Sequence, residues 1–313
     1  MARFRQIIAP VTLVLFAACG KDVGTLLSPD GSNGQPALGT ADINFMLGAT
    51  GESLAYEFQA IQIWRSPFAV RYVALRYNIL TFAFGANGIC TPAASNATDT
   101  NHNGIPDDAT LTFTPQNCTL LNNSASGGVS GTMRVQDVGG LWGLRLTFNQ
   151  VKVDFAPDAT SHAVFQLDGT REIRIQAGGV TTTNQVNQSL SATSSTGSAT
   201  LSLANNFTTT FTPDGTGKLD PNLNVPAGSL STSGSVVLTA AGTGAAALPG
   251  GLQQATFTAT FSTPTPLHFD GQCTSEYVFS SGQLKINITS TIGSASQTIQ
   301  WPACGSTPPG TKV

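Results

Sequence analysis

The chain has 313 residues and a formal net charge of -3 at pH 7, and charged residues make up 10% of it. This balance lacks the basic excess of a nucleic-acid-binding protein, so we expect no nucleic-acid partner. Threonine and serine provide 41 and 27 residues, and hydrophobic residues make up 40% of the chain. That composition is too apolar for wholesale disorder and too rich in small hydroxyl side chains for a mainly helical protein.

The N-terminus has the order of a secretory signal peptide. Arg3 and Arg5 form a short basic segment, an apolar run covers residues 7–16, and small residues lead to Cys19. The apolar run is too short to cross a bilayer as a helix, which takes about 20 residues. We therefore expect residues 1–18 to be a signal peptide that directs export.

The residues around Cys19 narrow this interpretation. The sequence Phe16-Ala17-Ala18-Cys19 resembles the lipobox of bacterial lipoproteins, with Phe16 where that family usually has Leu. The resemblance implies cleavage before Cys19 and lipid on its sulfur and amino group, which would anchor the protein stably. Gly20, where Asp would favour the inner membrane, points to the outer membrane. The alternative is an ordinary signal peptide cut at a nearby A-x-A-like site.

The composition of the chain predicts a division into four segments. Residues 1–18 are the signal peptide, and 19–40, rich in Gly, Pro, Ser and Asp, are a flexible tether. Residues 41–304 form the β-rich domain, in which Ser- and Gly-rich echoes suggest two related halves dividing near 176–200. Residues 305–313 are expected to be a disordered tail. Loss of Arg3 and Arg5 on cleavage makes the mature chain more acidic.

The other cysteines predict a disulfide framework, because an exported protein meets an oxidising environment. They are Cys90, Cys118, Cys273 and Cys304. The expected pairs are Cys90–Cys118 and Cys273–Cys304, which close two loops of similar length. Each such loop of roughly 30 residues is worth about 3–4 kcal/mol in the chain-entropy model. The long-range pairing, Cys118–Cys273 with Cys90–Cys304, stays open as the alternative.

From Thr110 onward, apolar residues alternate with Thr, Ser, Asn or Gln between turn signals. This period of two is typical of strands with one solvated face. The sequence therefore predicts an all-β fold, a large antiparallel sheet system formed as a barrel, half-barrel or sandwich. Asp168-Gly169 indicates a hairpin inside residues 163–175. Residues 70–84 suggest another strand, and 45–66 allow at most one short N-terminal helix, although a bulged strand fits the same residues.

One loop has the oxygen spacing of a calcium site. Asx side chains fall at alternate positions around a glycine, Gly104, and Ca²⁺ takes six to eight oxygens. The loop resembles the calcium loops of thrombospondin type 3 repeats, and more loosely an EF-hand, with Thr110 in place of the bidentate Glu. The resemblance implies one structural Ca²⁺, and the alternative is an Asx-rich turn that needs no ion. The predicted ligands are Asp99, Asn101, Asn103, the Ile105 carbonyl, Asp107 and Asp108.

No G-x-S-x-G, H-E-x-x-H, P-loop or dinucleotide motif occurs in the sequence, so no catalytic residue is predicted. Trp142, between two glycines, reads as a bend or an exposed aromatic. The leading hypothesis is a non-enzymatic cell-envelope lipoprotein, a structural or binding module whose lipid engages the membrane. A carrier of lipid or another apolar ligand in a curved β-sheet cavity is the alternative, and a glycan-acting enzyme comes third. The protein or glycan that such a module would bind is not specified by the sequence.

Overall fold

The computed structural model describes residues 89–90, 92–96, 98–103, 105–115, 118–122, 125–215, 226–244, 253–270, 279–290 and 293–301. The predicted signal peptide, Cys19, the tether, and the segments 45–66 and 70–84 lie outside the described residues. Cys273, Cys304 and the tail at 305–313 lie outside them as well.

The described residues form thirteen strands that belong to one antiparallel sheet. The six strands from β6 to β11 are each 16 or 17 residues long, about three times the usual strand length. The strands are β1 (Ile89–Cys90), β2 (Ala93–Ser95), β3 (Asp108–Phe113), β4 (Cys118–Asn122), β5 (Ala125–Asp137), β6 (Trp142–Asp158), β7 (Ser161–Gln176), β8 (Gly179–Ser194), β9 (Gly197–Pro213), β10 (Gly228–Gly244), β11 (Gln254–Phe269), β12 (Phe279–Ser290) and β13 (Gly293–Trp301).

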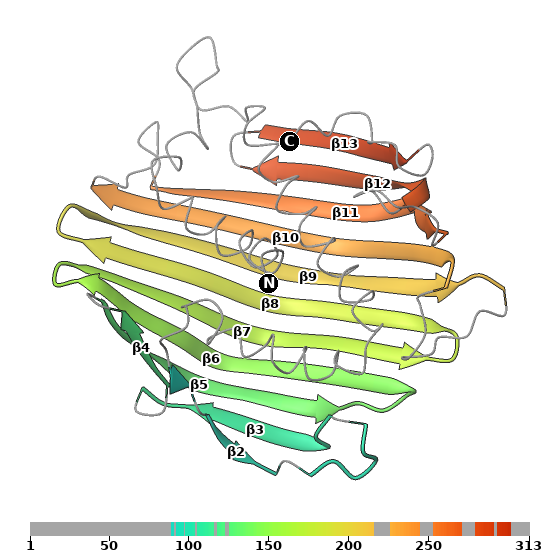
Figure 1. Cartoon of the computed structure of the whole chain (residues 1–313). Coiled ribbons are helices and arrows are strands. Elements are labelled where there is room, and N and C mark those ends of the chain that lie inside the picture. Colours follow the sequence, from blue (N-terminus) through green and yellow to red (C-terminus); the bar gives the residue numbers. More distant parts are fainter. Residues whose placement is uncertain are drawn as a thin grey trace.

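From β4 to β13 each strand pairs with the next one along the chain, which makes the sheet a meander (Figure 1). At one side β5 pairs with both β4 and β3, and the short strands β1 and β2 complete that edge. The sheet is not closed. The predicted all-β class is confirmed, and its described form is a single open sheet. Among the described residues, no helix is long and apolar enough to cross a membrane.

Alternation along each strand separates the two faces of the sheet. In β10, Leu230, Val236 and Leu238 are buried, and the residues between them are mainly Ser and Thr. Neighbouring strands keep this register, so that Val236 lies between Asn205 of β9 and Ala259 of β11. Because successive side chains point to opposite faces, this register collects the apolar side chains on one face.

The apolar face contains two clusters of buried side chains. The first extends from β3 to β8 and includes Phe211 and Leu230 from the ends of β9 and β10. The second is formed by β9 to β13, where the rings of Phe207 and Phe261 meet edge to face at 5.5 Å between centroids. Trp142 is buried in the first cluster with 7% of its surface exposed, so its interpretation as an exposed aromatic is wrong.

Interruptions of the register occur within the long strands. They occur between β5 and β6, β6 and β7, β10 and β11, and β11 and β12. Gly131 and Gly169 lie in such places with φ of 107° and 116°, a region that other residues rarely adopt. Such bulges and glycines bend strands and increase their twist. The long sheet is therefore bent within its strands as well as at its turns.

The hairpin predicted at Asp168-Gly169 is wrong, because β7 runs through these residues without a turn. Gly169 is instead a point of close backbone approach. A Cβ atom there would lie 2.0 Å from the carbonyl oxygen of Gln185 in β8. The glycine is required by the neighbouring strand, and the Asp-Gly pair carries a local signal that the tertiary structure overrides.

We expect Gly169→Ala to destabilise the fold by more than about 2 kcal/mol, because it combines an unfavourable φ with a backbone clash. Gly178→Ala, in the turn between β7 and β8, is the matched control, since a Cβ there would meet nothing within 4 Å. Urea unfolding of the two variants checks this. Equal unfolding midpoints for the two variants would contradict the role given to Gly169.

Candidate functional site

The Asx-rich loop connects β2 to β3 at one end of the sheet. The amide of Asp107 donates to the Thr98 carbonyl at 2.7 Å, which closes the loop. Ile105 is 2% exposed and packs in the first apolar cluster. The loop is thus fixed at its ends by the backbone and in its middle by a buried aliphatic side chain.

The predicted ligand oxygens bond to the loop's own donors. Asp99 Oδ1 accepts the amide of Asn103 at 3.2 Å, and Asn103 Oδ1 accepts the amide of Ile105 at 2.8 Å. The Asp107 carboxylate accepts both the amide and the hydroxyl of Thr100, at 3.2 and 2.5 Å. The bond between Asn103 and Ile105 is an Asx turn, and the others cross the loop; together such bonds order a loop without an ion.

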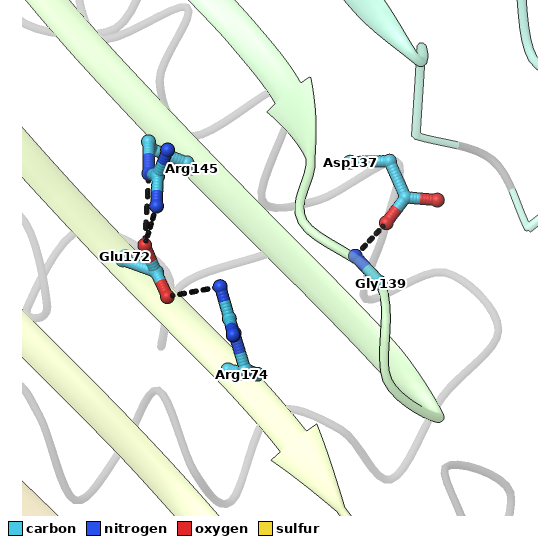
Figure 2. Close-up of polar contacts among 5 residues, drawn as sticks. All are labelled: Asp137, Gly139, Arg145, Glu172 and Arg174. Carbon is cyan, nitrogen blue, oxygen red and sulfur yellow. Dashed lines mark hydrogen bonds and ion pairs between the residues drawn. The ribbon is translucent and has the colours of Figure 1, made fainter.

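Asp137, at the end of β5, is a member of this site that the sequence analysis missed. Its Oδ2 accepts the side-chain amides of Asn101 at 2.7 Å and Asn103 at 2.9 Å. Its Oδ1 accepts the amide of Gly139 at 2.7 Å (Figure 2), and its own amide donates to the Pro106 carbonyl. Asp137 therefore ties the loop to the turn between β5 and β6.

Asp108 faces another partner. Its two carboxylate oxygens accept Nε and Nη2 of Arg134 at 2.6 and 2.5 Å, across the β3–β5 pair. The hydrogen bonds from this guanidinium hold the pKa of the Asp108 carboxyl below its ordinary value. The carboxylate of Asp108 is therefore engaged by a cation, whereas Asp99, Asn101, Asn103 and Asp137 are linked to one another.

The donor set of this loop is suited to a hard cation, because carboxylate, amide and carbonyl oxygens are the ligands of Ca²⁺. Within the described part of the chain, no three His, Cys, Asp or Glu side chains come together as a group that could hold a metal. Asn101 and Asn103 present their nitrogens to Asp137. A bound cation would require these two amides to turn their oxygens inward, with Asp137 as a further carboxylate beside them.

A second polar group lies on β6 and β7 (Figure 2). Glu172 accepts Arg145 Nη2 at 2.6 Å and Nε at 2.8 Å, and Arg174 Nη2 lies 3.0 Å from its other oxygen. Arg145 and Glu172 are direct cross-strand partners, and Arg174 follows two positions along β7. The group carries one excess positive charge, and its partly exposed position makes each pair weakly stabilising.

The two described histidines within strands are each paired with an aspartate. His162 Nε2 lies 2.7 Å from Asp154, and both side chains are largely exposed. His268 bridges Asp214, at 2.8 Å from Nε2, and Ser280, at 2.9 Å from Nδ1.

This Asp–His–Ser group connects the end of β9 to β11 and β12. The Ser280 hydroxyl also lies 3.2 Å from the His268 carbonyl, within hydrogen-bond distance. A hydroxyl has one proton, so the Ser280 hydroxyl can donate either to that carbonyl or to the His268 ring. The geometry is that of a cross-strand tie. Asp214 is 54 residues from His268, which hid the group from the sequence analysis.

The predicted pair Cys90 and Cys118 falls on β1 and β4, whose side chains are outside the description. The register of the two strands makes Cys90 and Cys118 direct partners. Direct partners in an antiparallel pair have Cα atoms about 4.5–5.5 Å apart, within the 4.4–6.8 Å range of disulfides. This register supports the local pairing over the crossed one.

No family model matches this chain, and no curated protein and no solved structure shows a significant match to it.

We expect Ca²⁺ at 1 mM to stabilise the fold by only about 0.4–1.4 kcal/mol, from a dissociation constant of about 10⁻⁴–10⁻³ M. The melting temperature of the wild-type protein should therefore rise modestly when Ca²⁺ is added. In Asp99→Ala and in Asp137→Ala, added Ca²⁺ should no longer raise the melting temperature. Asp154→Ala, which removes a carboxylate from β6, should retain this rise. No heat of binding in calorimetry would leave the loop as a turn held by its own hydrogen bonds.

The Asp108–Arg134 pair predicts a pH dependence of stability. Because the pKa of Asp108 is lowered in the folded protein, the pair stabilises the fold above the carboxyl's unfolded pKa. The stabilisation is lost as the pH falls through the lower, folded pKa. Asp108→Asn should therefore cost stability at neutral pH and not at strongly acidic pH, by urea unfolding. In an Arg134→Gln background the same substitution should have no such pH-dependent effect.

We expect non-reducing peptide mapping of the exported protein to recover Cys90 linked to Cys118. Cys118→Ser should lower stability by about 3–4 kcal/mol, the entropy of closing a loop of roughly 30 residues in the unfolded chain. Reduction of the Cys90–Cys118 bond in the wild-type protein should lower the free energy of unfolding by a similar amount. Peptides that join Cys118 to Cys273 would refute the local pairing.

Proposed function

We propose that this protein is a non-enzymatic cell-envelope lipoprotein, anchored through lipid on Cys19 to the outer membrane, whose sheet is the structural or binding module. The anchor rests on the order of basic, apolar and small residues before Cys19. Residues 19–40 would act as the tether that holds the module away from the lipid.

One observation carries the proposal of a display module, namely the separation of the two faces of the open sheet. The apolar face supplies the buried clusters. The other face presents hydroxyl and amide groups, and β8, β9, β10 and β13 contain no charged residue. A partner of this face would be recognised by hydrogen bonds to neutral groups, and less by charge.

The apolar face favours a second candidate, a carrier of a lipid or another apolar ligand. Its buried side chains come from every long strand of a single layer, including Val180, Phe211 and Val236. Because these side chains are already shielded from solvent, an apolar ligand would have to take the place of whatever shields them, and it would bury its own apolar surface at about 25 cal/mol per Å². The carrier and the display module differ in whether a lipid is bound without a covalent link.

Mass spectrometry of the protein extracted from membranes tests both candidates. We expect the mature chain to begin at Cys19 with the added mass of its acyl chains, and Cys19→Ser to leave the membrane fraction. Gly20→Asp is the matched variant, which should keep the lipid and move the protein to the inner membrane on a density gradient.

The outcomes separate the hypotheses. An unmodified N-terminus, together with unchanged fractionation of Cys19→Ser, would defeat the lipoprotein proposal. A stoichiometric lipid that survives native mass spectrometry, and is lost on unfolding, would favour the carrier. A chain that carries acyl groups on Cys19 alone would favour the display module.

A further inference from the structure

The two edges of the sheet differ in the length and composition of their edge strands. One edge consists of β1 and β2, of two and three residues. The other is β13, nine residues long, which contains no proline, lysine or other charged residue. Among the described residues only β12 pairs with β13. Natural sheets usually protect an edge with short strands, charges, proline or bulges, and β13 has none of these devices.

The pairing of β12 with β13 tells which backbone groups face outward. Nine consecutive residue pairs join the strands without a shift of register, beginning with Ser290 and Gly293. Two residues separate this first pair, so its members must bond to each other. Alternation then turns the backbone N–H and C=O of every even-numbered residue of β13 away from β12. These residues are Ser294, Ser296, Thr298 and Gln300, all with exposed side chains.

We propose that β13 pairs with β13 of a second copy of this chain, antiparallel and centred on Gln297. This register puts Ser296 opposite Thr298 and Ser294 opposite Gln300, so the outward-facing groups of all four residues find partners. It also places Ala295 opposite Ile299, on the face to which buried Ile299 belongs. The apolar and polar faces then both continue into the second sheet.

A second copy fits this edge because the strand is complementary to itself about a two-fold axis. A two-fold self-pairing brings any charge near the centre of the strand close to its own symmetry mate, and β13 carries no charge. Its side chains alternate between exposed hydroxyl or amide groups and half-buried or buried positions, as in an interior strand. The interface is isologous, so it closes at two copies and leaves only the short-strand edges.

A cysteine at the centre of the proposed interface tests the register. At Gln297 the two copies face each other in a pair without direct hydrogen bonds, with Cα atoms about 4.5 Å apart. Gln297→Cys should therefore form a disulfide-linked dimer under mild oxidation. Ser294→Cys is the matched control, because its two copies would lie about 20 Å apart along the strands. The wild-type chain controls for the native cysteines.

Light scattering on the folded full-length Cys19→Ser chain tests the association itself. We expect a dimer whose dissociation constant rises at least tenfold in Thr298→Pro, which removes an outward N–H and leaves the β12 bonds in place. Circular dichroism should show that this variant is folded. A wild-type chain that stays monomeric at every concentration would overturn the proposal. So would equal cross-linking of Gln297→Cys and Ser294→Cys.

Discussion

One constraint governs this molecule, namely that a single open sheet must place most of its large apolar side chains on the same face. A strand repeats every two residues, so a slip of one residue would move a whole strand's apolar set to the solvated side. The registers of β7 to β11 hold this pattern through strands of 16 and 17 residues. Both apolar clusters depend on it.

The polar face follows from the same constraint. The ion pairs Asp108–Arg134 and Arg145–Glu172, and the hydrogen-bonded pair Asp154–His162, join neighbouring strands between β3 and β7. Farther along the sheet, hydroxyl and amide groups replace them. Some hydroxyls are also buried among the apolar side chains, where Thr209 and Thr232 bond to each other at 2.9 Å. A chain with 10% charged residues thereby keeps one face solvated mainly with neutral groups.

The sequence predicted the features that depend on interactions between residues close together in the chain. It predicted fewer of the features that depend on contacts with neighbouring strands. Alternation from Thr110 onward indicated the all-β fold, because the period of two is local. Asp168-Gly169 misled for the same reason, since the close approach of Gln185 is a property of the next strand. In the Asx-rich loop the local Asx turns were visible in the sequence. Asp137, which binds Asn101 and Asn103, comes from the end of β5 and carries no local signal.

The most direct test of the account compares two adjacent valines of β10 that lie on opposite faces. Val236 is fully buried in the second apolar cluster, and Val237 is partly exposed beside Thr258 and Ala204. The measurement is the free energy of unfolding in urea for Val236→Asp and Val237→Asp. A buried unpaired carboxylate should cost Val236→Asp most or all of its stability, and Val237→Asp should stay folded with a small loss. Equal losses in the two variants would contradict a sheet that buries one face.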